Sequence, residues 1–177
     1  MADQQGLVQI YYGDGKGKTT AAFGLAFRCA GWGRRVIIAQ FLKSRACGEV
    51  MAAERFPELT VLRTKEIHKF TFQMNEEEKA ATALNCRDLF RQAAALAVEE
   101  NARLLVMDEA IDAVRGGFLP VDELCAFLDS RPEGLEVVLT GHSLPQELAD
   151  RADYISHVQK EKHPYDKGIV ARKEIEF

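Results

Sequence analysis

The fold of this chain is decided by the stretch Gly13-Asp14-Gly15-Lys16-Gly17-Lys18-Thr19-Thr20. A mostly apolar run at residues 7–12 precedes it, and a helix-like segment at residues 21–30 follows it. A strand, a glycine-rich turn and a helix in this order place backbone N–H groups and a helix N-terminus around a polyphosphate. We expect Lys18 to reach phosphate oxygens and the Thr19 hydroxyl to bind magnesium. The stretch therefore predicts a nucleoside triphosphate site.

One position departs from the strict form of this motif. The pattern requires glycine five residues before Gly17, and this chain has Tyr12 there. Gly13 and Gly15 still supply flexible backbone, so the loop is predicted to be shifted or one glycine short. The alternative is a glycine-rich turn with chance lysines. The preceding strand, the Gly-Lys-Thr-Thr ending and an acidic strand later in the chain argue against that alternative.

Length and composition limit the class of protein. The 177 residues fit a single domain, residues 1–177, with 28% charged and 47% hydrophobic residues. The net charge of −4 argues against a nucleic-acid binder. No apolar run approaches the ~20 residues of a membrane span, and the first residues lack the features of a signal peptide. Four dispersed cysteines without a Cys-x-x-Cys pair predict reduced thiols in a cytoplasmic protein and no metal cluster.

Short apolar runs alternate with longer helical ones along the chain. The predicted strands are residues 7–12, 36–41, 59–62, 104–107 and 136–140, with an outer strand at 153–158. The predicted helices are residues 19–31, 48–56, 76–100, 121–129 and 145–152. Apolar strands without alternation indicate a mostly parallel sheet that is buried on both faces. The sequence therefore predicts an α/β fold with three layers, in which helices flank the sheet.

In such a sheet the ligand lies beyond the carboxyl ends of the strands. This rule brings together the residues that follow the first, second, fourth and fifth strands, namely 13–20, 40–43, 108–109 and 140–142. Asp108 is predicted to bind magnesium, directly or through water, because the metal must bridge Thr19 and the phosphates. Glu109 is predicted to polarise a water, contact the ribose or touch a second substrate. The alternative role for Asp108 is to cap the next helix.

Other classes of P-loop protein are disfavoured by parts that the sequence lacks. The chain has no Asn-Lys-x-Asp motif for reading guanine and no arginine-rich lid, and it has Gly13 where partitioning ATPases need a lysine. No Ser-His-Asp, Cys-His or paired-carboxylate arrangement indicates a nucleophile or a general base. One explanation is that the reacting group arrives on the second substrate.

The chain resembles the ATP:corrinoid adenosyltransferases of the CobA/CobO/BtuR type over nearly its full length. The glycine-rich loop with Tyr12 matches that family's variant of the motif. The other matching segments are residues 40–43, 48–49, 70–72, 108–109, 131–132, 139–141, 162–169 and 175–177. The combination of the loop, the aromatic segment and the C-terminal segment is more specific than the loop alone.

The resemblance implies a P-loop NTPase (RecA-like) domain that transfers the 5′-deoxyadenosyl group of ATP to the Co(I) of a reduced corrinoid and releases triphosphate. It implies that ATP is bound by Gly13, Asp14, Gly15, Lys16, Gly17, Lys18, Thr19 and Thr20. Catalytic roles are implied for Lys18, Thr19, Asp108 and Glu109, with Mg²⁺, or Mn²⁺ in its place, on Thr19 and Asp108. A flavoprotein reductant and a homodimer are also expected from the family.

The resemblance also implies a role for Phe70 and Phe72. The family's aromatic pair is associated with the lower face of the corrinoid, where it keeps an axial ligand off cobalt and makes Co(II) easier to reduce. The second aromatic residue is often tryptophan in the family and is Phe72 here. From the sequence alone, two phenylalanines at i and i+2 also fit one face of a buried strand.

Two other classes of function are weighed against the adenosyltransferase. The first is a P-loop ATPase or nucleotide kinase that shares the scaffold. The second is a corrinoid or nucleotide chaperone without enzymatic activity. The three functions differ in their products, because only an adenosyltransferase yields triphosphate together with an alkylated cobalt.

Overall fold

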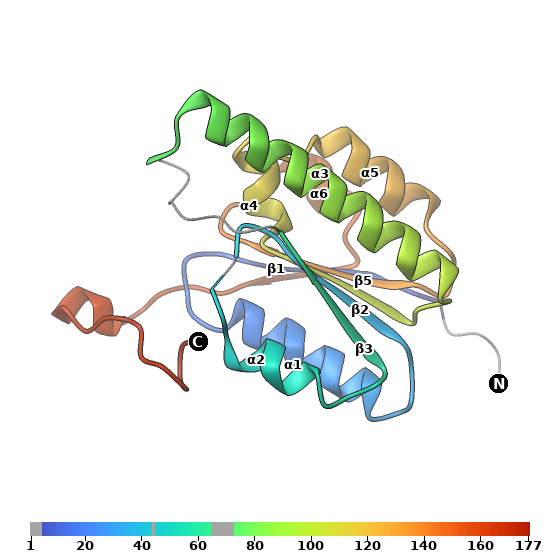
Figure 1. The fold of residues 1–177 in the computed structure, drawn as a ribbon, viewed down its shortest axis with the longest axis horizontal. Helices are drawn as coiled ribbons and strands as arrows, with labels where there is room; N and C mark the ends of the chain where they lie inside the picture. Colours follow the sequence, from blue (N-terminus) through green and yellow to red (C-terminus); the bar gives the residue numbers. More distant parts are fainter. Residues whose placement is uncertain (1–4, 44, 65–72) are drawn as a thin grey trace.

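The computed structural model describes residues 5–43, 45–64 and 73–177 (Figure 1). Its centre is a sheet of six strands: β1 (Val8–Tyr12), β2 (Val36–Gln40), β3 (Leu59–Arg63), β4 (Leu104–Asp108), β5 (Glu136–Gly141) and β6 (Tyr154–His157). The strand order is β3-β2-β4-β5-β1-β6, and every neighbouring pair is parallel. The predicted parallel sheet is confirmed, and the predicted strand positions agree to within one or two residues.

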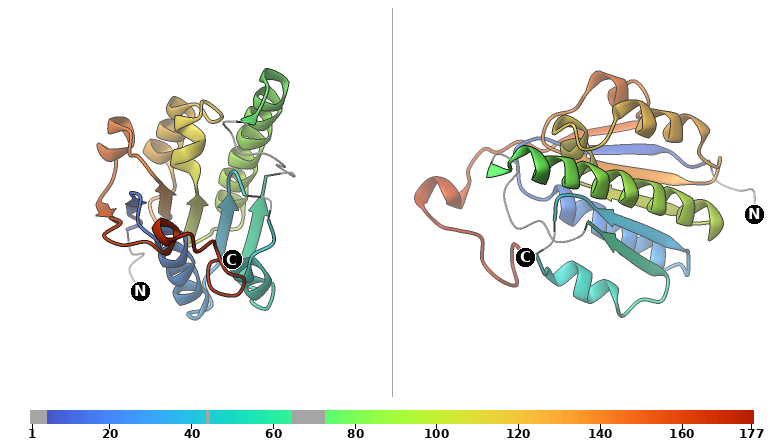
Figure 2. Two further views of the ribbon diagram at one scale, coloured as in Figure 1. Left: turned by 90° about the vertical axis from the view of Figure 1, so that its left-hand side faces the viewer. Right: turned by 45° about the horizontal axis from the view of Figure 1, so that its top comes forward.

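Helices cover both faces of the sheet (Figures 1 and 2). One face packs against α1 (Lys18–Ala30) and α2 (Gly48–Ala53). The other packs against α3 (Glu76–Glu99), α4 (Ala110–Arg115), α5 (Val121–Ser130) and α6 (Gln146–Ala149). All residues of β2 and β4 are therefore buried, which explains why these strands are apolar without alternation up to their last residues, Gln40 and Asp108.

The N-termini of α1 and α3 differ in how their backbone N–H groups are capped. Asn75 begins α3 with a capping box, in which its side chain accepts from the Glu78 N–H at 2.8 Å and Glu78 accepts from the Asn75 N–H at 2.9 Å. No side chain caps α1, whose N-cap is Gly17. The N–H groups of the first turn of α1 are thus left for an anion.

Three parts of the fold differ from the sequence-based prediction. The short helix α4 was not predicted, because it follows β4 after the single residue Glu109, whose left-handed backbone no residue pattern indicates. The helices α2 and α6 are shorter than predicted. The segment after Lys160, which the sequence did not assign, contains a 3₁₀ helix, η2 (Pro164–Lys167), and crosses the end of the sheet where α1 begins (Figure 1).

Two further findings concern the outer strand of the sheet and the length of the helices. All four residues of β6 are exposed, as expected of an outer strand. Within the described parts of the chain, no helix is both long enough and apolar enough to cross a membrane.

Candidate nucleotide-binding site

The loop between β1 and α1 requires glycine at two positions, both because of the backbone conformation and, at one of them, because of a close contact. Gly13 (φ 119°) and Gly17 (φ 117°) adopt backbone conformations that side chains disfavour. A Cβ at Gly13 would also lie 2.3 Å from the Val158 carbonyl oxygen. The Gly15 N–H donates to the same oxygen at 2.8 Å. The loop is therefore held directly against the backbone that follows β6.

Tyr12 occupies the position where the strict motif has glycine. It is the last residue of β1, and its ring stacks on His157 of β6 with centroids 4.5 Å apart and an interplanar angle of 8°. The loop therefore begins at Gly13, one residue later than the strict pattern. An aromatic residue fits at position 12 because that position belongs to the strand and not to the turn.

Replacing Gly13 with alanine tests the close approach of the loop. We expect Gly13→Ala to lower the melting temperature and weaken ATP binding by at least tenfold, because the new methyl group clashes with the Val158 backbone. The matched control is Gly24→Ala, since an added Cβ at this exposed helical glycine has no atom within 4 Å. The control should be neutral or stabilise the protein by about 0.5–1 kcal/mol. Equal behaviour of the two variants would contradict this account.

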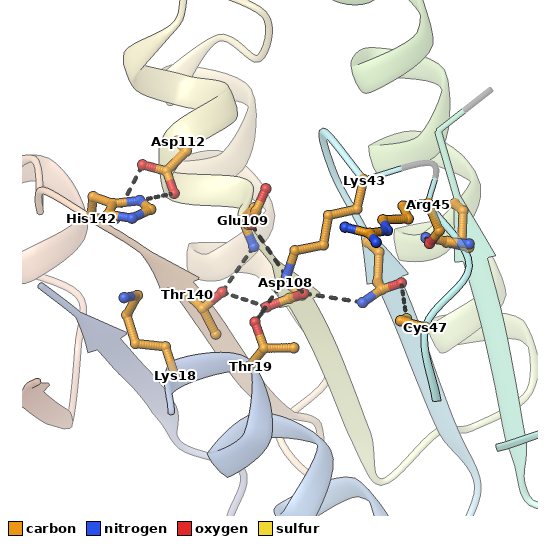
Figure 3. Close-up of polar contacts among 12 residues, drawn as sticks. Lys18, Thr19, Lys43, Arg45, Cys47, Asp108, Glu109, Asp112, Thr140 and His142 are labelled. Carbon is orange, nitrogen blue, oxygen red and sulfur yellow. Dashed lines mark hydrogen bonds and ion pairs between the residues drawn. The ribbon is translucent and has the colours of Figure 1, made fainter. Parts of the chain in front are cut away.

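Asp108 is the centre of the polar network at the end of β4 (Figure 3). Its side chain is fully buried. One carboxylate oxygen accepts from the hydroxyls of Thr19 at 2.9 Å and Thr140 at 2.8 Å. The other accepts from Lys43 Nζ at 2.8 Å and Gln40 Nε2 at 3.2 Å. Buried charge needs such partners, and here they come from three separate segments that meet Asp108 at the carboxyl ends of the strands.

The network places Lys43 between the predicted metal-binding groups. Lys43 Nζ lies 2.9 Å from Thr19 Oγ1 and 3.2 Å from Glu109 Oε1, besides its contact with Asp108. Burial alone would lower the pKa of Lys43, but the carboxylates of Asp108 and Glu109 outweigh it and raise that pKa. Burial raises the pKa of Glu109, and the nearby Lys43 ammonium partly offsets this increase. The sequence predicted that the segment 40–43 lies at the ligand site, but it did not assign a role to Lys43.

Lys18 lies apart from this network, on the side of His142 (Figure 3). Its ammonium donates to the Gly15 carbonyl at 2.8 Å. Burial lowers the pKa of Lys18, and Asp112 and Glu109 oppose this effect. A polyphosphate in the loop would add negative charge beside the ammonium and stabilise its charged form.

His142 and Asp112 form a pair at the edge of the site that the sequence did not predict. Asp112 accepts from the His142 backbone N–H at 3.1 Å, and its other carboxylate oxygen lies 2.9 Å from His142 Nδ1. Asp112 belongs to α4, the helix that the sequence pattern missed. The signal for His142 was its place directly after β5, in the segment 140–142.

A cavity of about 470 Å³ lies over the loop and the ends of the strands. Such a volume suits a small ligand. Its far wall is the C-terminal segment, where the Lys160 N–H donates to Asp14 at 3.0 Å and the Arg45 guanidinium lies 3.2 Å from the centre of the Phe177 ring. The lining residues from this segment are His163, Ala171, Ile175, Glu176 and Phe177.

The structure brings most of the predicted site residues to one place. Asp14 to Thr20 and Glu109 line the cavity, and Asp108 contacts Thr19 beside it. Gly13 lies at the base of the loop. Phe70 and Phe72 fall outside the described residues, so their predicted role remains a prediction.

The parallel sheet, the glycine-rich loop at the start of α1 and the acidic end of β4 define a P-loop nucleotide-binding protein. Solved structures support this fold class. The chain is similar to a KaiC-like protein from Pyrococcus horikoshii OT3, with a TM-score of 0.53, 16% identity and coverage of 90% of this chain and 75% of that one. It is also similar to EssC (ATPases 2 and 3) from Geobacillus thermodenitrificans, with a TM-score of 0.51, 13% identity and coverage of 96% and 35%.

Sequence comparison gives the family. Residues 4–177 match the model of the ATP:corrinoid adenosyltransferase BtuR/CobO/CobP family. The chain is 31% identical to the corrinoid adenosyltransferase of Escherichia coli (strain K12) over 99% of this chain and 87% of that protein. It is 31% identical to the corrinoid adenosyltransferase of Pseudomonas aeruginosa, over 99% and 85%. The chain belongs to the ATP:corrinoid adenosyltransferase family and is a transferase; a P-loop ATPase or nucleotide kinase is not favoured.

Proposed function

We propose that the protein transfers the 5′-deoxyadenosyl group of ATP to the cobalt of a reduced corrinoid and releases triphosphate. The observation that carries the proposal is the Thr19–Asp108 contact beside the glycine-rich loop, at the base of a cavity large enough for a nucleotide. Together with the family, this geometry supports a site that holds the triphosphate as the leaving group.

The loop and Lys18 act on the triphosphate. The N–H groups of the first turn of α1 bind its oxygens, since no side chain caps that helix. The N–H groups of Gly13 and Gly15 already donate to backbone carbonyls, so they hold the loop in place instead. As the bond between C5′ and the triphosphate oxygen breaks, its electron pair moves onto the triphosphate. Lys18 stabilises the charge that grows there.

Thr19 and Asp108 would hold magnesium. Their oxygens are 2.9 Å apart, and a hydroxyl with a carboxylate is the kind of hard oxygen donor set that Mg²⁺ prefers. Mn²⁺ takes the same ligands. The metal, when bound, would neutralise part of the phosphate charge.

Glu109 acts on the ribose of ATP or on the second substrate. Its carboxylate lines the cavity, and Lys43 contacts Oε1. This position supports a contact with the ribose or with the second substrate.

The protein needs no nucleophile of its own in this reaction. Co(I) attacks C5′, so the cobalt–carbon bond forms as the carbon–oxygen bond breaks, and cobalt is formally oxidised to Co(III). The task of the protein is to align the two substrates. We therefore place ATP with its 5′ carbon open to the corrinoid, and a nucleotide-bound structure with that carbon buried away from the cavity would overturn this orientation.

The function is tested by incubating the protein with ATP, Mg²⁺ and chemically reduced cobalamin. We expect the spectrum of an alkyl-cobalt corrinoid to appear together with one equivalent of triphosphate. Release of ADP or orthophosphate would instead indicate an ATPase or kinase. Binding of both substrates without turnover would indicate a chaperone.

Phe70 and Phe72 are proposed to face the lower side of the corrinoid. Replacing either with alanine is expected to reduce adenosylation that starts from Co(II) by at least tenfold and to affect prereduced Co(I) much less, because an axial ligand can then return to cobalt and lower its potential. The control is Trp32→Ala, which removes an exposed aromatic side chain on the α1 side of the sheet. Equal losses from Co(II) and Co(I) would contradict the role in reduction.

The organisation around this reaction is proposed from the family and the composition. Residues 1–177 form one adenosyltransferase domain, which acts as a homodimer in the cytoplasm. A flavoprotein supplies the electrons that reduce cobalt. Size-exclusion chromatography with light scattering tests the dimer, and reduction by a purified flavoprotein in place of a chemical reductant tests the electron source.

A further inference from the structure

Two residues outside the glycine-rich loop hold strained backbone conformations on either side of Asp108. Leu42 (φ 54°) follows β2, and Glu109 (φ 63°) follows β4. Such values are uncommon for residues other than glycine and cluster at functional sites. Here the two turns direct Lys43 and Glu109 toward the same point at the end of the sheet (Figure 3).

At that point the Lys43 ammonium contacts three oxygens. They belong to Asp108 at 2.8 Å, Thr19 at 2.9 Å and Glu109 at 3.2 Å. Two of these residues, Thr19 and Asp108, are the ones proposed to hold magnesium. The two carboxylates carry a charge of −2 when ionised, and Lys43 reduces that sum to −1. The ammonium thus already neutralises half of the negative charge at the position where a metal would bind.

We propose that Lys43 is a positioning residue that keeps free divalent metal out of the site, so that the metal enters with ATP. The inference rests on the proposed magnesium site. A metal bound to Thr19 and Asp108 would lie close to the ammonium, and two cations at that distance repel each other strongly in a partly buried site. Free metal must overcome this repulsion with only the net charge of −1 of Asp108, Glu109 and Lys43 to attract it.

The nucleotide changes this balance because it brings its own negative charge. The Lys43 side chain is 30% exposed and lines the cavity, so its ammonium can turn from Asp108 toward a phosphate oxygen. Thr19 and Asp108 are then released to the metal that accompanies the triphosphate. Lys43 would exchange its contacts with Thr19 and Asp108 for the phosphate oxygen, and no bond to carbon or cobalt is involved.

The test compares binding of Mn²⁺ to the full-length protein without nucleotide, followed by the electron paramagnetic resonance of free Mn²⁺. We expect Lys43→Met to bind Mn²⁺ at least tenfold more tightly than the wild type, because the competing charge is gone. Lys43→Arg, which keeps the charge, should bind as weakly as the wild type. Lys43→Gln repeats the comparison in a polar background, so the test does not depend on the folding of one variant.

Two controls separate this effect from general changes in charge. Lys79→Met removes an exposed lysine that pairs with Glu76 on α3, and it should leave Mn²⁺ binding unchanged. The double variant Lys43→Met/Asp108→Asn should lose the gain in affinity. Equal Mn²⁺ affinity of wild type, Lys43→Met and Lys43→Gln would overturn the inference. Failure of the wild type to bind Mn·ATP in equilibrium dialysis would instead overturn the nucleotide site on which the inference rests.

Discussion

Replacing Lys18 with alanine is expected to reduce kcat/KM for ATP by about 100- to 1,000-fold. This is the usual effect of removing one donor that stabilises growing charge in a transition state. Lys18 is well placed for this role because its ammonium lies over the loop, bonded only to the Gly15 carbonyl at 2.8 Å among the contacts described. The measurement is steady-state adenosylation of chemically reduced cobalamin with ATP as the varied substrate.

The controls for Lys18→Ala separate catalysis from folding. The melting temperature should change little, because the variant loses a single hydrogen bond to the backbone. Lys79→Ala removes an exposed lysine from α3 and should keep the wild-type kcat/KM. A Lys18→Ala variant that retains more than about one hundredth of the wild-type kcat/KM would contradict the assigned role, since its loss would be smaller than the smallest loss expected.

Replacing Asp108 with asparagine is expected to abolish adenosylation and to lower the free energy of unfolding by about 3–5 kcal/mol. The carboxylate accepts four hydrogen bonds and is fully buried. An amide of the same shape turns an NH₂ group toward donors and leaves the Lys43 ammonium with weaker compensation. The measurement is urea denaturation together with the adenosylation assay.

The control for Asp108→Asn is Asp129→Asn, the same change at an exposed aspartate. Asp129 pairs with Arg151 on the surface, at 2.8 and 2.9 Å. Exposed pairs of this kind contribute little to stability. Asp129→Asn should therefore leave both activity and melting temperature near those of the wild type. If the urea midpoint of Asp108→Asn equals that of the wild type, the buried network does not stabilise the fold.

The secondary structure could be predicted from the sequence where the pattern is long or strong. The central strands β2, β4 and β5 are short, mostly apolar runs, and burial on both faces explains that pattern. The longest helix, α3, is marked by Asn75 and Glu78 at its start. The six-residue helix α4 could not be predicted, because it begins directly after β4 at Glu109, and no residue pattern indicates that left-handed turn.

The site was predictable only in part, and the limit has a clear physical origin. The rule that ligands lie at the carboxyl ends of parallel strands indicated that Thr19 and Asp108 share an edge of the sheet. It does not give the direction of a side chain. The left-handed backbone at Leu42 turns Lys43 into the cluster, and nothing in the residue pattern indicates that turn. The pair of His142 and Asp112 was missed because it depends on α4.

The glycine-rich loop between a strand and a helix could be recognised in the sequence alone, and its Gly-Lys-Thr-Thr ending predicts a triphosphate site. These features are local, since they depend on backbone freedom and on residues a few positions apart. The tertiary structure alone decided that Lys43 lies among the proposed metal ligands and that the C-terminal segment forms the far wall of the cavity. Both facts depend on the order of the strands and the packing between distant segments, which no short stretch of sequence encodes.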